Sequence, residues 1–192
     1  MKVRFRKYSK IPLGNGMSGR DIVEKMLRDN NINGVKIGSV KGQLTDHYNP
    51  VNKTINLSYE VYHGTSIASA AVAAHECGHA IQHAKAYSWL GLRSKLVPIA
   101  SFSSRYVQWI LLLGIILAQT RPEILLAGIA LFGITTLFTI ITLPVEVNAS
   151  KRALAWLSGA GIATAGTYEK AEDALRWAAS SYFIAALGSI AA

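Results

Sequence analysis

Residues 73–80 read Ala-Ala-His-Glu-Cys-Gly-His-Ala, and the interpretation of the whole chain starts from this stretch. It lies within residues 66–86, where alanine is abundant and Ser66 is a suitable N-cap, so the sequence predicts a helix. His75 and His79 are four residues apart and therefore project from one face, about 6 Å apart along the helix axis. Two imidazoles placed in this way can bind one zinc ion.

Glu76 directly follows the first histidine and is predicted to lie beside the metal. There its carboxylate can take a proton from metal-activated water and later pass it to a leaving amine. The alternative is a pair of ordinary solvated histidines on a helix, which the small and apolar neighbours disfavour. Cys77 is the only cysteine, so no internal disulfide can form, and we expect a small buried residue there.

A third metal ligand is expected, because a catalytic zinc ion usually has three protein ligands and one open position. Glu146 follows directly after a long apolar run, where a carboxylate is costly unless it is paired or functional. We predict that Glu146 is this ligand. The alternative is an ion pair with Lys151 or Arg152 at the membrane surface.

Four more polar residues are candidates for contacts around the metal. His83 continues the series of histidines, but it lies about 12 Å from His75 along a straight helix, so it suits an orienting or surface position better than a ligand position. Asp46 and His47 could orient a ligand, stabilise an oxyanion, or simply belong to a polar hairpin. Asn148 is a further candidate for contacts with the site or the substrate.

The second half of the chain contains two long apolar runs. Residues 107–119 are strongly hydrophobic, and extension back to about residue 97 gives the ~20 residues that a bilayer requires. Residues 124–143 form a second run without any charge. The short turn between them predicts a transmembrane hairpin with both outer ends on one side. The low charged fraction of 16% agrees, since soluble domains have roughly 25%.

The charge distribution predicts the orientation of this hairpin. The chain has a net charge of +9, and 19 of its 20 Lys and Arg residues lie outside the turn, which holds only Arg121. The positive-inside rule therefore places the site on the cytoplasmic side of a multi-pass protein of the cell membrane, in contact with anionic lipid. We do not expect nucleic acid as a partner, because no zinc-finger spacing or aromatic-basic stripe is present.

The first half is predicted to contain a helix followed by strands. Residues 1–17 are expected to be an irregular basic lead-in, because proline and glycine recur from position 12. Ser18 begins a helix with Asp21 three residues later, as in a capping box. Residues 43–48 and 53–58 then read as a β-hairpin around a turn-like Asn-Pro-Val-Asn sequence.

Several stretches of the chain together resemble the YugP-like family of membrane zinc peptidases, also called neutral zinc metallopeptidases. The matching stretches are Lys7-Tyr8-Ser9-Lys10, Leu44-Thr45-Asp46-His47-Tyr48, Leu57-Ser58, residues 73–83 and Leu143-Pro144-Val145-Glu146-Val147-Asn148-Ala149-Ser150. The resemblance implies a membrane peptidase with His75 and His79 as zinc ligands and Glu76 as the base.

The same resemblance carries two further expectations. Related membrane zincins, such as prenyl-protein and heat-shock proteases, have a glutamate ligand at the position of Glu146, and they often have aspartate four residues later. Here that position is Ser150, so the usual supporting carboxylate is not expected. Members of the family typically begin with a transmembrane helix, and residues 1–17 contain no such apolar run.

The predicted fold is mainly α with a small β-hairpin or sheet, in which a zincin-like catalytic core is fused to the transmembrane helical hairpin. Gly91 is expected to break the chain before the hairpin, and Pro144 to begin or kink a helix after it. Four parts follow: residues 1–96 with the motif helix, 97–143 with the hairpin, 144–167 with the third ligand, and 168–192 as a membrane-associated C-terminal helix.

The predicted function is that of a membrane-embedded, zinc-dependent endopeptidase of gluzincin-like type, acting on membrane or unfolded polypeptides. One alternative is a non-catalytic membrane scaffold or holdase with a structural zinc ion, closed by four protein ligands. The other is a site-2-type intramembrane protease. Gln82 and His83 follow the motif too soon for a helix buried in lipid, which disfavours that alternative.

Overall fold

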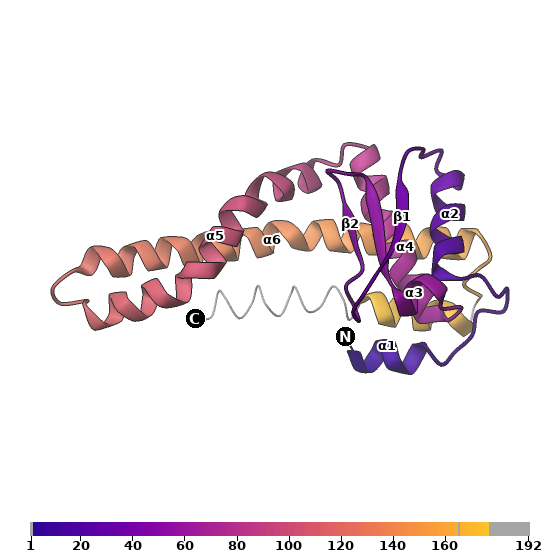
Figure 1. Ribbon diagram of the computed structural model, residues 1–192, viewed down its shortest axis with the longest axis horizontal. Coiled ribbons are helices and arrows are strands. Elements are labelled where there is room, and N and C mark those ends of the chain that lie inside the picture. The colour runs from indigo at the N-terminus through magenta and orange to yellow at the C-terminus, as the bar shows by residue number, and fades with distance from the viewer. Residues whose placement is uncertain (1, 165, 177–192) are drawn as a thin grey trace. The chain divides into compact units, whose positions relative to one another are not determined.

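The computed structural model describes residues 2–164 and 166–176, and these are mainly helical with one small sheet (Figure 1). Their contacts define two compact units, which are described separately. The first unit contains the described residues up to Tyr87 and from Val145 onward, and the second contains Ser88–Pro144. The predicted C-terminal membrane helix lies mostly outside the described residues, which end at position 176.

The first unit contains eight named elements or parts of them. In chain order they are α1 (Lys2–Tyr8), α2 (Gly19–Asp29), β1 (Lys36–Val40), β2 (His47–Asn49), β3 (Thr54–Ser58), α3 (Tyr59–His63), α4 (Ile67–Ala84) and the last part of α6, whose full bounds are Pro122–Gly159.

Helix α2 begins as the sequence predicts. The backbone N–H of Asp21 donates to the Ser18 hydroxyl at 3.2 Å, and the Ser18 N–H donates to the Asp21 carboxylate at 2.9 Å, which completes a capping box. Hydrogen bonds from Ser18 hold the pKa of Asp21 below its usual value. The side chains of Ile22, Val23 and Met26 on α2 are fully buried in the core.

The lead-in before α2 is not wholly irregular, because α1 is helical from Lys2 to Tyr8. The prediction was wrong for these residues, because proline and glycine occur only from position 12 onward and do not prevent a helix before it. Tyr8 is buried, and its hydroxyl donates to the carboxylate of Asp173. This contact joins α1 to a segment far away in the sequence.

The sheet has the order β1-β3-β2. Strand β2 pairs antiparallel with β3, with Tyr48 opposite Ile55, so the predicted hairpin is present. Its first strand is shorter than predicted, because Gly42 and Leu44 both have positive φ and the chain turns there instead of extending. Strand β1 pairs parallel with β3, a pairing that the sequence did not predict.

Helix α4 lies in the core of the first unit. Ser66 caps it by accepting from the N–H of Ser69, as predicted, and almost every residue from Ile67 to Gln82 is buried. Its small side chains allow α6 to come very close. A Cβ atom added at Gly78 would lie 2.7 Å from the carbonyl oxygen of Ala149, so glycine is required at this crossing.

The second unit is an antiparallel helical hairpin made of α5 (Ser88–Ile116) and the first part of α6. Both helices are long and apolar enough to cross a membrane, with mean hydropathies of 1.4 and 2.4. Gly114 packs against the backbone of Leu125, and Gly128 packs against Leu111. Small residues therefore let the two helices approach closely, as in membrane helix pairs.

Two predicted interruptions of these helices are placed differently. Gly91 does not break the chain, because α5 already begins at Ser88 and continues through it. The break lies just before, where Ala86 has a φ of 49°. Pro144 lies inside α6, which continues to Gly159. A new helix therefore does not begin at this proline, and the other expected outcome, a kink in a continuing helix, stays a prediction.

The crossing at Gly78 gives a prediction about stability. Gly78→Ala should lower the free energy of unfolding by about 1–3 kcal/mol, because the new methyl group would clash with backbone atoms that cannot rotate away. The measurement is thermal or denaturant unfolding in detergent. Gly91→Ala is the matched control, since no atom lies within 4 Å of its Cβ position, and it should be neutral or stabilising by about 0.5–1 kcal/mol. Equal stabilities of the two variants would contradict the steric argument.

Candidate metal centre

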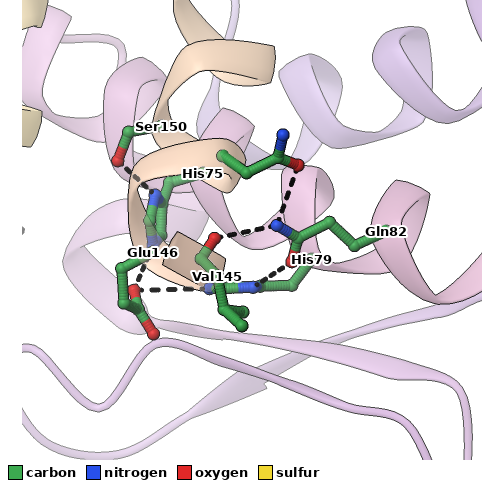
Figure 2. Close-up of polar contacts among 7 residues, drawn as sticks. His75, His79, Gln82, Val145, Glu146 and Ser150 are labelled. Atoms are coloured by element: carbon green, nitrogen blue, oxygen red, sulfur yellow. Dashed lines mark hydrogen bonds and ion pairs between the residues drawn. The ribbon is translucent and has the colours of Figure 1, made fainter. Parts of the chain in front are cut away.

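Two helices of the first unit bring three candidate metal ligands together, as Figure 2 shows for His75, His79 and Glu146. His75 and His79 lie one turn apart on α4, and Glu146 comes from α6. Their candidate ligand atoms all lie within 4.8 Å of one another. All three residues are buried, with exposed fractions of 8%, 7% and 5%. The spacing of the motif and the position of Glu146 thus converge on one point.

The two distances from Glu146 to the histidine nitrogens fit one zinc ion. Ligand atoms that lie about 2.0–2.2 Å from a tetrahedral ion are roughly 3.3–3.5 Å from one another. Here the Nε2 atom of His75 lies 3.1 Å from Oε2 of Glu146, and Nε2 of His79 lies 3.6 Å from the same oxygen. The two rings stand nearly perpendicular, with centroids 4.8 Å apart. The two distances lie on either side of the tetrahedral value.

The electrostatics of the centre favour a cation. Burial lowers the pKa of His79, but the hydrogen bond with Glu146 and the charges of Glu76 and Glu146 outweigh this effect and raise it. A buried, negatively charged carboxylate between two imidazoles therefore attracts positive charge, either a proton on a ring or a metal ion. Cys77 is not suited to share that role, because burial raises the pKa of its thiol.

Glu76 is buried beside this centre, with an exposed fraction of 8%. Its charge raises the pKa of His79 and contributes to the raised pKa of Asp46, for which burial is the largest cause. Glu76 therefore lies close enough to both groups for its charge to act on them.

The second nitrogen of each histidine has a neutral partner. The Ser150 hydroxyl lies 3.1 Å from Nδ1 of His75, at the position where the resemblance led us to expect no supporting carboxylate. The Gln82 side chain lies 3.0 Å from Nδ1 of His79 (Figure 2). Sequence reasoning assigned no role to Gln82. Its spacing of three residues from His79, on the same side of a helix, was the available signal.

The other predicted residues lie around the centre in different ways. Asp46 accepts hydrogen bonds from the backbone N–H and the hydroxyl of Ser58, so it ties its loop to the end of β3. His47 is exposed and hydrogen-bonds with the side chain of Asn56. His83 hydrogen-bonds with the Tyr48 hydroxyl at 2.7 Å. These three residues contact the sheet, and their contacts do not join them to the two histidines.

Asn148 does reach the centre, through Gln82. The Gln82 amide nitrogen donates to the Asn148 side-chain oxygen at 3.0 Å and to the Val145 carbonyl at 2.8 Å. The Arg152 guanidinium donates to the same Asn148 oxygen at 2.7 Å. A chain of polar groups on α6 therefore extends through Gln82 to His79.

Two histidines on one buried helix and a glutamate from a second helix form a possible metal site, and the described residues include two candidate membrane helices. The family model described as "Putative neutral zinc metallopeptidase" matches residues 1–192, and the chain belongs to this family. It is 37% identical over 190 residues to "Putative membrane protease YugP" of Bacillus subtilis (strain 168), covering 99% of this chain and 84% of the relative. No solved structure matches the chain significantly.

The geometry predicts that Glu146 contributes strongly to metal binding. Zinc sites with four ligands have binding free energies of roughly 10–16 kcal/mol, or about 3 kcal/mol per ligand, so Glu146→Gln should weaken zinc binding about 100-fold. Competition with a chromophoric chelator would measure the dissociation constant. Glu123→Gln is the matched control on the same helix, because Glu123 is exposed and pairs with Arg121. Similar constants for both variants would rule out Glu146 as a ligand.

Proposed function

We propose that this protein is a zinc-dependent endopeptidase with a zincin-like, gluzincin-type centre. His75, His79 and Glu146 would hold the ion, and their convergence within 4.8 Å is the observation that carries the proposal. The family supports a peptidase, and the name of the relative supports a membrane protease. A polypeptide is the substrate class that follows from the family.

The chemistry divides between the ion and the protein. Zinc, when bound, supplies a Lewis acid that makes water nucleophilic at neutral pH. Glu76 would accept a proton from the attacking water on its carboxylate and deliver it to the leaving amine nitrogen. Its buried position, next to His75 in the sequence and close enough to His79 for its charge to act on that ring, supports this role. His75, His79 and Glu146 keep the reacting groups in place.

The alternative of a structural zinc site is less well supported. Such a site needs a fourth protein ligand, for which His83 and His47 were the candidates. The ring of His83 is hydrogen-bonded to Tyr48, and that of His47 to Asn56. Within residues 2–164 and 166–176, the ligand cluster contains three residues, so a tetrahedral ion held there would have one coordination position left for water.

A site-2-type protease would carry its histidines on a membrane helix. Helix α4 instead packs against α2, α3 and the sheet, and the candidate membrane helices among the described residues are α5 and α6. This arrangement supports a peptidase whose catalytic residues lie outside the apolar hairpin. The proposed division into residues 1–96, 97–143, 144–167 and 168–192 assigns the motif helix and Glu146 to parts outside the hairpin.

The second unit would cross the membrane as a helical hairpin in a multi-pass protein. Its outer surface is apolar, and the side chains of Trp109, Ile116 and Leu126 are exposed by 70%, 70% and 66%. Such a surface is stable in lipid and costly in water. The charge distribution supports a cytoplasmic site and contact with anionic lipid. Membrane-bound or unfolded polypeptides would then be the accessible substrates.

Glu76→Gln tests the catalytic role. The amide cannot accept the proton, so hydrolysis of an unfolded protein such as casein should fall by about 10²–10⁴-fold. Zinc should remain bound, because the three ligands are unchanged. Glu24→Gln, an exposed residue of α2, is the control and should keep wild-type activity. Activity of the Glu76 variant at the level of this control would refute Glu76 as the base.

The orientation is testable by cysteine labelling. Val51 is 93% exposed in the first unit, Thr120 is exposed in the turn of the hairpin, and native Cys77 is fully buried. In spheroplasts, a membrane-impermeant maleimide should label Thr120→Cys directly and Val51→Cys only after lysis. Unmodified protein is the control for Cys77. Labelling of Val51→Cys in intact spheroplasts would place the centre outside the cytoplasm.

A further inference from the structure

The neutral ring of His79 can carry its proton on Nδ1 or on Nε2, and only one of these tautomers presents a lone pair to the centre. Nε2 is the atom 3.6 Å from Glu146, so a metal ligand must keep this nitrogen free of a proton. The contacts of Gln82 determine which tautomer forms. This inference rests on the metal centre that we propose above.

The orientation of the Gln82 amide is fixed by two groups that cannot exchange roles. The Val145 carbonyl oxygen, 2.8 Å from Gln82 Nε2, can only accept a hydrogen bond. The Arg152 guanidinium can only donate, so the Asn148 atom that it contacts at 2.7 Å must be the oxygen. That same oxygen lies 3.0 Å from Gln82 Nε2. Both neighbours therefore require the NH₂ group of Gln82 on this side.

The other end of the amide then faces His79 as an acceptor. Gln82 Oε1 lies 3.0 Å from Nδ1 of His79, and a carbonyl oxygen has no proton to donate. Nδ1 must therefore carry a proton, both in the neutral ring that can bind a metal and in the doubly protonated ring. Gln82 is fully buried, so water cannot easily replace this contact. The lone pair of Nε2 is left pointing at a carboxylate oxygen, and two acceptors at this distance are stable only with a cation between them.

We propose that Gln82 is a positioning residue that holds His79 in the tautomer able to bind zinc, and that Val145, Asn148 and Arg152 of α6 set its orientation. The same side chain joins α4 to the turn of α6 that carries Glu146. One amide would thus set both the proton position on a ligand and the approach of the helix that supplies the third ligand.

The two histidines differ in this respect. The partner of His75 Nδ1 is the Ser150 hydroxyl, which can donate or accept and therefore does not select a tautomer. Ser150 is consequently the matched control for Gln82, because it contacts the other histidine of the same centre. Removal of the serine hydroxyl should affect His75 without changing the proton position on His79.

Gln82→Met is the first test, because methionine has a similar length and cannot make these hydrogen bonds. Loss of an outer partner of a ligand histidine typically costs 10–100-fold in metal affinity, and we expect a loss of this size for zinc. Nitrogen-15 spectra of the metal-free, histidine-labelled protein should show the proton of neutral His79 on Nδ1 in the wild type. In Gln82→Met this preference should be lost, whereas Ser150→Ala should retain it.

Arg152→Met and Lys151→Met form a second, milder pair on the surface side of α6. Both remove one cation, but only Arg152 contacts Asn148, and Lys151 is exposed. Zinc affinity should fall in the Arg152 variant by several-fold relative to the Lys151 variant, less than in Gln82→Met because the Val145 carbonyl still orients the amide. This pair keeps the proposal testable if Gln82→Met does not fold.

The outcomes separate the two proposals. Failure of the wild type to bind zinc, or unchanged binding in His79→Ala, would refute the metal centre itself. Zinc binding that depends on His79 but is unchanged in Gln82→Met, with Nδ1 still protonated, would refute the positioning role and leave the centre intact. A lower unfolding temperature of Gln82→Met with unchanged affinity and tautomer would mean a purely structural residue and would also refute it.

Discussion

The structure depends on one buried juxtaposition, in which the Glu146 carboxylate approaches two imidazoles of the same helix. These groups lie 3.1 and 3.6 Å apart in the core of the first unit, where an uncompensated carboxylate would be costly. The cost is offset when positive charge is held between them. The neighbouring sequence is therefore constrained twice, by the packing that brings the helices together and by the groups that set proton positions.

The packing constraint explains the composition of α4. A helix that carries two histidines and a glutamate toward the interior cannot also have large side chains around them, since α6 must come within reach of the rings. Alanine and glycine at the neighbouring positions allow this approach, and at Gly78 the backbone of Ala149 occupies the space of a side chain. Glycine likewise allows close packing of the two helices at Gly114 and Gly128 in the second unit.

Much of this arrangement could be predicted from local patterns. The limits of α4, the capping box of α2 and the turn after Asn49 all depend on residues close together in sequence. Glu146 could be predicted as a candidate ligand because a carboxylate beside an apolar run is costly unless it is paired or functional. What local patterns could not give was the parallel pairing of β1 with β3, because the chain reverses direction twice between them, into β2 and out of it, and β3 then lies between the other two strands.

The role of Gln82 escaped prediction for a different reason. An amide has both a donor and an acceptor end, and the sequence does not tell which end faces which neighbour. Only the tertiary contacts with α6 make its orientation definite. The positive φ angles of Leu44 and Ala86 could not be predicted either, because such an angle in a residue with a side chain is imposed by its tertiary surroundings.

The neutral partners of the two histidines suit the charge already present. Glu146 and residue 150 lie one turn apart on α6, so an aspartate at 150 would have placed a second negative charge on the same face. Glu76 and Asp46 are also nearby. Burial and the charge of Glu76 raise the pKa of Asp46, and the charge of Glu76 also contributes to the raised pKa of His79. A serine hydroxyl and a glutamine amide can orient the rings without adding to this repulsion. The two groups that contact the second nitrogens of the histidines therefore add no negative charge to a site that already contains Glu146.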